Sequence, residues 1–266
     1  MESIKVFVRV RPLRVQNNEN LCYDVAAHVS SDNKEISVEA PTRQIQCRYD
    51  HVFAQESTQP EIYHHVRSSM NAFLNGINST IFAYGQTGSG KTYTMMGRES
   101  CIFDEPGIVP RCINDTFQYI GGKNNENYSF SVFVSFIQVY NEQVYDMLDD
   151  PKRMKPLAIH ERSSASNISI PGLTEYHVHC YKQCLALIEI GLKNRAIRET
   201  AMNNASSRSH SILQVILEQT RPGKTTLHSK LNLVDLAGSE RWSVSYGKGT
   251  GMGNGQILEL TNINSR

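Results

Sequence analysis

The chain has six cysteines but no C-x-x-C pair, no recognisable signal sequence and no apolar run long enough to span a membrane. The missing pairs exclude the usual spacing of a zinc site, and the missing signal sequence argues against a secreted disulfide scaffold. The missing apolar run argues against a membrane-spanning helix. We therefore expect a cytosolic protein with reduced thiols, namely Cys22, Cys47, Cys101, Cys112, Cys180 and Cys184.

The chain also has no large excess of charge of either sign. Lys and Arg number 27 against 26 Asp and Glu, which gives a net charge of +1. This balance argues against a broad nucleic-acid-binding face and leaves any acidic partner to a local patch. No Pro/Gly/Ser-rich linker or break in composition divides the 266 residues. We therefore expect one α/β domain with a large core.

The most informative motif is GQTGSGKT at residues 85–92, which fits the P-loop pattern G-x-x-x-x-G-K-[ST]. It follows the β-branched and aromatic stretch 79–84, expected as a buried strand, and residues 91–96 can open a helix. Glycines let backbone N–H groups turn toward phosphate oxygens, and the helix dipole favours the same anion. We expect Lys91 to reach the β- and γ-phosphates and the Thr92 hydroxyl to bind Mg²⁺.

Hydrophobic periodicity predicts strands and helices along the rest of the chain. The expected strands lie at 4–12, 35–40, 44–53, 128–140, 209–220 and 225–236, and the expected helices at 61–74, 108–120 and 180–197. The last two strands should form a hairpin with a turn at Pro222-Gly223. A surface loop at 98–107 is expected to interrupt one long helix. The inner face of the first helix is expected to carry Ile62, Val66, Met70 and Phe73 or Leu74.

Two further segments suggest a nucleotide switch. NNASSRSH at 203–210 is dense in hydroxyls and amides where a loop is expected, and LVDLAGSE spans 233–240. Asp235 lies at the carboxyl end of an apolar strand, where a P-loop fold places the acidic residue that holds Mg²⁺ through water. Gly238 can offer its N–H to a γ-phosphate. Each segment alone could be a solvated loop or a plain turn, but their order favours γ-phosphate sensing.

The chain resembles a kinesin motor domain over nearly its whole length. The motifs that carry the resemblance are FVRVRP, YDHVF, STIFAYGQTGSGKTYTMMG, QVYNEQVYDML, NNASSRSHSI, LVDLAGSER and ELTNIN. A small GTPase would need a guanine-reading N-K-x-D, which the sequence lacks. The resemblance implies an α/β P-loop NTPase fold, with a central, mostly parallel twisted sheet and helices on both faces.

The resemblance also implies residue roles for ATP and Mg²⁺. The P-loop residues around the phosphates are Gly85, Gln86, Thr87, Gly88, Ser89, Gly90, Lys91 and Thr92. Arg9, Arg11 and Pro12 would border the adenine, and Tyr93 would stack on it. Mg²⁺ would be held by Thr92, Ser207 and Asp235. The catalytic set comprises Lys91, Asn203, Ser206, Arg208, Gly238 and Glu240, with Arg208 and Glu240 pairing to close the site.

The activity implied by the resemblance is ATP hydrolysis coupled to movement on microtubules, with tubulin as partner and a cytoplasmic, cytoskeletal location. Neither nucleic acid nor a membrane is an expected partner. The alternative is a nucleotide-gated microtubule-binding or regulatory module without motility. Tubulin-stimulated turnover would separate the two.

The sequence departs from the family pattern in two places. It stops at residue 266, inside what resembles the start of the relay helix, so we expect residues 1–266 to lack the later microtubule-binding elements, the neck linker and any dimerisation or cargo segment. Residues 246–256 are also longer than usual and have Gly at every second position from Gly247 to Gly255. That segment is either a mobile surface insertion or a loop that orders on tubulin.

Overall fold

The structure, a computed structural model, describes residues 4–12, 27–40, 43–98, 105–123, 128–153, 155–162, 167–201, 208–220, 223 and 225–240. Contacts within the chain group it into two compact units, residues 1–65 and 66–266. The expectation that they form one domain stays a prediction.

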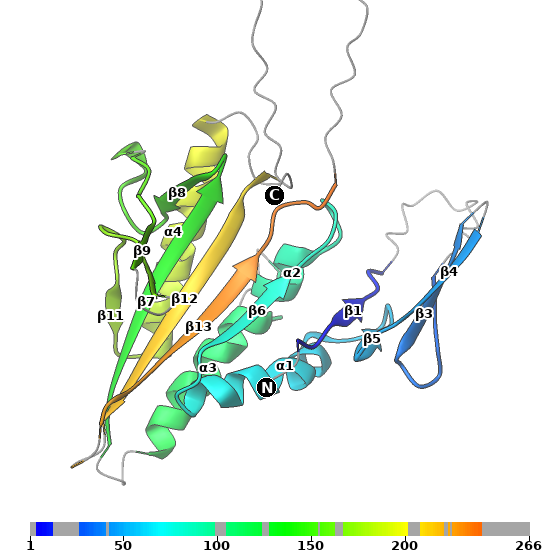
Figure 1. Ribbon diagram of the computed structural model, residues 1–266, viewed down its shortest axis with the longest axis horizontal. Helices are drawn as coiled ribbons and strands as arrows, with labels where there is room; N and C mark the ends of the chain where they lie inside the picture. Colours follow the sequence, from blue (N-terminus) through cyan, green and yellow to red (C-terminus); the bar gives the residue numbers. More distant parts are fainter. Residues whose placement is uncertain are drawn as a thin grey trace, which may run out of the picture. The chain divides into compact units, whose positions relative to one another are not determined.

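The N-terminal unit contains two small sheets (Figure 1). Strand β1 (Phe7–Arg9) pairs in parallel with β5 (His51–Phe53). The other sheet is antiparallel and consists of β2 (Ala27–Val29), β3 (Glu35–Ala40) and β4 (Arg43–Arg48). Strand β3 confirms the strand expected at 35–40, whereas the stretch expected at 44–53 is divided between β4 and β5, which belong to different sheets. Strand β1 is shorter than the stretch predicted at 4–12.

Helix α1 (Gln59–Leu74) runs from the first unit into the second, and its sequence sets both of its ends. At the start, the backbone N–H of Thr58 donates to the Glu61 carboxylate at 2.8 Å, as in a capping box. At the end, Gly76 adopts a φ of 88°. The backbone N–H of Ile77 then reaches the Ala72 carbonyl at 3.0 Å, which closes a Schellman motif. The predicted inner face is confirmed, because Ile62, Val66, Met70 and Phe73 are all buried.

The second unit is built on a six-stranded sheet with the order β11-β7-β12-β13-β6, and β8 pairs with the free part of β7. Its strands are β6 (Ser79–Ala83), β7 (Ser129–Tyr140), β8 (Gln143–Asp146), β11 (Tyr176–Val178), β12 (His210–Thr220) and β13 (Leu227–Asp235). Strand β12 alternates between buried and half-buried residues along most of its length. The buried set, which includes Leu213, Val215 and Leu217, contributes to the core.

The P-loop fold class is confirmed, but the sheet is mixed and not mostly parallel. Only the β13–β6 ladder is parallel among the described pairings of this sheet, and those joining β11, β7, β8, β12 and β13 are antiparallel. Short connections explain two of these pairings, β7–β8 and β12–β13. Strands β12 and β13 are joined by a hairpin with Gly223 at a φ of 71°, and a hairpin necessarily reverses chain direction.

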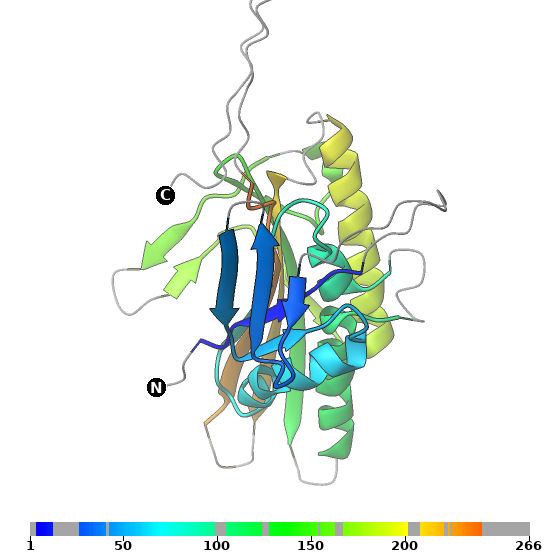
Figure 2. The same cartoon turned by 90° about the vertical axis from the view of Figure 1, so that its right-hand side faces the viewer.

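Helices α2 (Lys91–Met96), α3 (Ile108–Gly122) and α4 (Tyr181–Ala201) lie together on one face of this sheet (Figure 2). The break between α2 and α3 agrees with the predicted interruption of a long helix. Gly97 and Gly107 approach so closely there that a Cβ on either would meet backbone atoms. Helices on the opposite face, also expected from the sequence, stay a prediction.

The remaining elements of this unit are short: the 3₁₀-helix η1 (Pro151–Arg153) and the antiparallel pair β9 (His160–Arg162) and β10 (Asn167–Ser169). Within the described ranges no helix is long and apolar enough to cross a membrane. The cysteines in those ranges, Cys47, Cys112, Cys180 and Cys184, form no disulfide with one another.

Candidate functional site

The P-loop connects β6 to α2, as the sequence predicts (Figure 1). Gly88 and Gly90 have φ values of 79° and 99°, in the left-handed region that other residues rarely adopt. Gly90 directly precedes Lys91, the first residue of α2. The motif glycines are therefore needed for the path of the loop.

The Lys91 ammonium lies over the loop. Its Nζ donates to the backbone carbonyls of Gly85 and Gln86, each at 2.9 Å. Both acceptors are neutral backbone groups, so the charge of Lys91 has no carboxylate partner in these two bonds. The side chain can therefore exchange two carbonyl bonds for phosphate oxygens, which would be charge-assisted and stronger.

Thr92 and Asp235 meet at the carboxyl ends of β6 and β13. These strands are parallel, and Asp235 stands opposite Ala83, the last residue of β6. The Thr92 hydroxyl donates to Asp235 Oδ2 at 2.6 Å. Asp235 is 4% exposed, and its Oδ1 is buried without a hydrogen-bond partner in the described part of the chain. A hydroxyl beside a carboxylate with a spare oxygen is a donor set that suits Mg²⁺.

The segment after Asp235 folds against the P-loop. The backbone N–H of Ser239 donates to the Gly85 carbonyl at 3.1 Å, and that of Leu236 donates to the Ala83 carbonyl at 3.3 Å. A Cβ on Gly238 would overlap the Glu240 carboxylate and the Thr87 hydroxyl. Glycine at position 238 therefore leaves room for the contact between these two side chains.

Glu240 is bound to Thr87 of the P-loop. Its carboxylate accepts a hydrogen bond from the Thr87 backbone N–H at 2.9 Å and another from the Thr87 hydroxyl. Hydrogen bonding, first from the Thr87 side chain, lowers the pKa of Glu240 below its ordinary value. Arg208 is half-buried. Its expected pairing with Glu240 stays a prediction.

The centre of the hydroxyl-rich segment lies outside the described residues, and with it Asn203, Ser206 and Ser207. The described part resumes at Arg208 and continues into β12. There His210 Nδ1 accepts the Ala237 backbone N–H at 3.0 Å. Burial lowers the pKa of His210, which favours the neutral ring that this acceptor role requires. The two predicted switch segments are thus tied together just beyond Asp235.

The residues expected beside adenine belong to different units. Arg9 lies in the N-terminal unit and donates to the Gln59 side chain at 3.2 Å and the Ser57 carbonyl at 3.5 Å. Arg11 and Pro12 of the same unit are exposed. Tyr93 lies in the second unit, is 38% exposed, and its hydroxyl is 3.4 Å from Glu105 Oε2. Their role beside the base stays a prediction.

One charged residue beside Asp235 was missed by the reading of the sequence. Arg195, near the end of α4, places Nη1 3.8 Å from Asp235 Oδ2. Its guanidinium also donates to Ser211 Oγ at 3.4 Å and to Ser209 Oγ at 3.3 Å. The sequence did contain a signal for this residue, because a charged side chain occupies a position on the face of the helix that is otherwise expected to be buried. At helical spacing that face carries Cys184, Ile188, Gly191 and Arg195.

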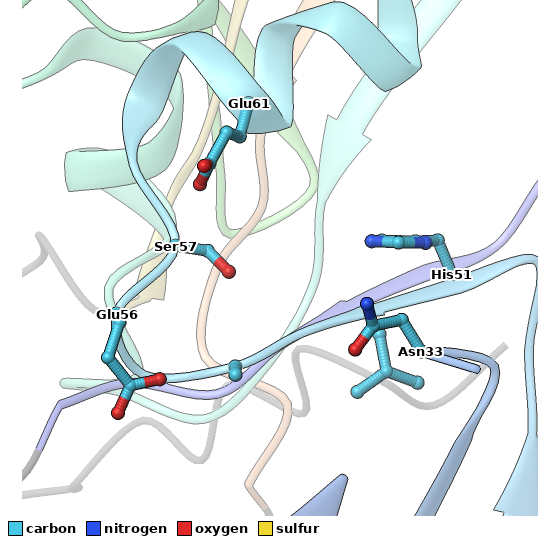
Figure 3. A pocket seen from close by; sticks show the side chains of 7 residues that line it. Asn33, His51, Glu56, Ser57 and Glu61 are labelled. Carbon is cyan, nitrogen blue, oxygen red and sulfur yellow. The ribbon is translucent and has the colours of Figure 1, made fainter. Parts of the chain in front are cut away.

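A separate cavity of about 210 Å³ belongs to the N-terminal unit (Figure 3). Glu61 points into it from α1, and Glu56 and Ser57 border it from the preceding segment. His51 and Asn33 lie across from them. The Glu61 carboxylate is already engaged by the Thr58 N–H. The cavity contains none of the predicted site residues.

Comparison with known proteins identifies the family. A family model described as the kinesin motor domain matches residues 9–265. The chain is similar to a solved structure entitled "Structure of a fast kinesin: Implications for ATPase mechanism and interactions with microtubules", with a TM-score of 0.83 and 33% identity. That match covers 98% of this chain and 71% of the other.

Curated relatives give the same result. The chain is 39% identical over 90% of its length to kinesin-like protein KIN-14P of Arabidopsis thaliana, and 38% identical over 98% to human centromere-associated protein E. Kinesin-related protein 5 of Dictyostelium discoideum is 37% identical over 93% of the chain. These matches span 24%, 9% and 25% of the respective relatives. The chain belongs to the kinesin motor-domain family.

Proposed function

We propose that the chain is an ATP-hydrolysing, microtubule-based motor domain that uses Mg·ATP. The observation that carries the proposal is the 2.6 Å contact between Thr92 of the P-loop and Asp235 at the end of β13. It brings together two oxygen donors from residues 143 positions apart. When bound there, Mg²⁺ would supply positive charge that neutralises the negative charge developing during phosphoryl transfer.

The residues of the chain would supply binding, orientation and charge. Lys91 would leave the carbonyls of Gly85 and Gln86 and contact the β- and γ-phosphates. Asp235 would hold the metal through Oδ1, the oxygen with no hydrogen-bond partner in the described part. The Gly238 N–H would contact the γ-phosphate without a side chain of its own in the way. Phosphoryl transfer to water needs positioning and electrostatic stabilisation more than covalent chemistry.

Residues 235–240, called the DxxG segment after Asp235 and Gly238, contact the P-loop, and these contacts support γ-phosphate sensing. Ser239 and Glu240 both bind the loop, through Gly85 and Thr87. A phosphate entering the loop needs the Thr87 N–H, which Glu240 occupies, so it would displace that contact. Loss of the γ-phosphate would release Gly238, and the following residues would transmit the change outward.

Tubulin is the proposed partner, and the cytoplasm with its cytoskeleton the proposed location. The support comes from family membership and from the similar solved structure, whose title names interactions with microtubules. A microtubule-stimulated ATPase is the expected behaviour of a motor, whereas a gating module need not hydrolyse faster on the filament.

The test is steady-state ATP hydrolysis over a series of microtubule concentrations. We expect turnover to rise with microtubules when the chain is extended through the microtubule-binding elements that residues 1–266 are expected to lack. In that extended chain, Asp235→Asn should abolish turnover at every microtubule concentration. Turnover that microtubules leave unchanged would reject the motor and favour the gating module. Turnover that survives Asp235→Asn would reject the proposed metal site.

A further inference from the structure

We propose that Glu105, in the connection between α2 and α3, is a positioning residue that orients the ring of Tyr93 for the nucleotide base. The inference rests on the proposed function, because it requires an adenine nucleotide at the P-loop. Glu105 itself would touch neither the base nor the phosphates. It acts through the aromatic ring whose hydroxyl contacts its carboxylate.

Tyr93 lies on the first turn of α2, two residues after the P-loop lysine. That turn is tied to the loop, because the Thr94 backbone N–H donates to the Gly90 carbonyl at 2.9 Å and the Thr94 hydroxyl donates to the same carbonyl at 3.0 Å. The backbone is thus fixed, yet Tyr93 is 38% exposed. An exposed aromatic ring beside a phosphate-binding loop offers a face on which a base can stack.

The contact with Glu105 restricts that ring. The Tyr93 hydroxyl donates to Glu105 Oε2 at 3.4 Å. The tyrosine ring turns about only two side-chain bonds, so a contact at its far end fixes the direction of the whole ring. A ring that is ordered before the nucleotide arrives loses less conformational freedom on binding, which favours the bound state.

The connection that carries Glu105 is itself held against α2. Gly97, at the end of α2, and Pro106 form an antiparallel β-bridge, and Arg111 of α3 donates its Nε to the Pro106 carbonyl at 3.0 Å. The Gly97 N–H in turn donates to the Tyr93 carbonyl at 2.9 Å. These contacts run from Tyr93 through the end of α2 to Glu105 and back to the Tyr93 hydroxyl, so the carboxylate is held beside the ring.

The test compares ADP with inorganic pyrophosphate, which is an anion of the same kind but has no base. Each is titrated in competition with a fluorescent ADP analogue in the presence of Mg²⁺. The readout is the dissociation constant for pyrophosphate divided by that for ADP, because removing a negative charge should affect both anions alike. In Glu105→Ala we expect this ratio to fall about threefold, the size expected when one side chain is no longer ordered in advance. A disturbed P-loop would instead weaken both ligands and leave the ratio unchanged.

Two further variants separate the hydrogen bond from the charge. Glu105→Gln keeps an oxygen that can accept from the Tyr93 hydroxyl and should retain most of the ratio. Tyr93→Phe keeps the aromatic face and removes the hydroxyl, so it should lower the ratio about as much as Glu105→Ala does. If Glu105 acts through Tyr93, the double variant should be no lower than either single variant. The matched control is Glu189→Ala, an exposed carboxylate on α4, which should leave the ratio unchanged.

Three outcomes would overturn the inference. An unchanged ratio in Glu105→Ala would reject a positioning role, whatever Tyr93→Phe shows. A raised ratio would mean that the contact holds the ring away from the base. Additive losses in the double variant would mean that Glu105 acts by a route other than Tyr93. Failure of the proposed function is a different result, since the unmodified chain would then bind ADP no more tightly than pyrophosphate.

Discussion

The carboxylate of Glu240 accepts the backbone N–H of Thr87 at 2.9 Å, so an acidic side chain of the DxxG segment occupies a donor in the middle of the P-loop. P-loop N–H groups are the donors that cradle nucleotide phosphates. Glu240 thus stands where a phosphate oxygen is expected, and the two anions compete for one donor.

This competition predicts tighter nucleotide binding when the charge of Glu240 is removed. Glu240→Gln should bind ADP in EDTA about three- to tenfold more tightly, because a neutral amide is a weaker acceptor than a carboxylate. Equilibrium titration with a fluorescent analogue measures the change. Glu189→Gln, an exposed position on α4, is the matched control. Unchanged or weaker binding by Glu240→Gln would show that the contact does not oppose the nucleotide.

A second prediction concerns Gly191, where helix propensity and packing oppose each other. A Cβ at this position of α4 would collide with the ring of Phe136, which is fully buried in β7. Replacing this glycine by alanine should stabilise the helix by up to about 1 kcal/mol through its higher helix propensity. Overpacking should cost about 1–3 kcal/mol. We therefore expect Gly191→Ala to lower the free energy of unfolding.

The matched control for Gly191 is Gly121 in α3, because a Cβ there would meet nothing within 4 Å. Gly121→Ala should be neutral or stabilise by up to about 1 kcal/mol. Urea denaturation of both variants gives the comparison. Stabilisation by Gly191→Ala as well would mean that α4 can shift away from the sheet at no cost.

A third prediction is a pH dependence carried by His65 in the N-terminal unit. Its ring stacks on His51 at 4.0 Å between centroids and meets Phe53 edge-on at 5.0 Å. Burial, and then the neighbouring His51 and His64, lower the pKa of His65 below its ordinary value. The neutral ring is therefore favoured in the folded state. The contribution of His65 to the free energy of unfolding is therefore complete above the ordinary histidine pKa. It is lost as the pH falls toward the lowered pKa of the folded state.

Acidification from about pH 7.5 to about pH 5.5 should therefore lower the free energy of unfolding more in the unmodified chain than in His65→Phe. Phenylalanine keeps an aromatic ring against Phe53 and cannot be protonated. Urea denaturation at both pH values measures the difference. Replacing His28, an exposed residue of β2, by Gln should leave the dependence as it is. If the free energy of unfolding depended on pH equally in His65→Phe and in the unmodified chain, another group would be responsible for that dependence.

Local sequence rules predicted the elements that surround the phosphate site well. The P-loop between β6 and α2, the inner face of α1 and the β12–β13 hairpin all follow from periodicity and from turn chemistry. The position of Asp235 beside Thr92 agrees with the Mg²⁺ ligands that the resemblance implied, because Asp235 ends β13 opposite Ala83, the last residue of the strand before the P-loop. The first three features are set by residues close together in the chain.

Strand direction and the long-range polar contacts were harder to predict. Periodicity does not encode strand direction, and the resemblance suggested a mostly parallel sheet where the ladders are largely antiparallel. The contact of Arg195 with Asp235 depends on how far α4 lies from β13, which no local pattern specifies. Glu240 was expected to bind Arg208, and its contact with Thr87 depends on a loop path that one sequence does not determine.

ATP turnover by Lys91→Ala tests the central claim most directly. The Lys91 ammonium is the cation placed over the P-loop, and its bonds to Gly85 and Gln86 engage only neutral carbonyls. Removing it should abolish hydrolysis, leaving less than about a tenth of the turnover of the unmodified chain. Lys193→Ala, an exposed lysine on α4, should turn over normally. If Lys91→Ala instead kept more than about a tenth, a barrier change below about 1.4 kcal/mol, this loop would not be the site of ATP hydrolysis.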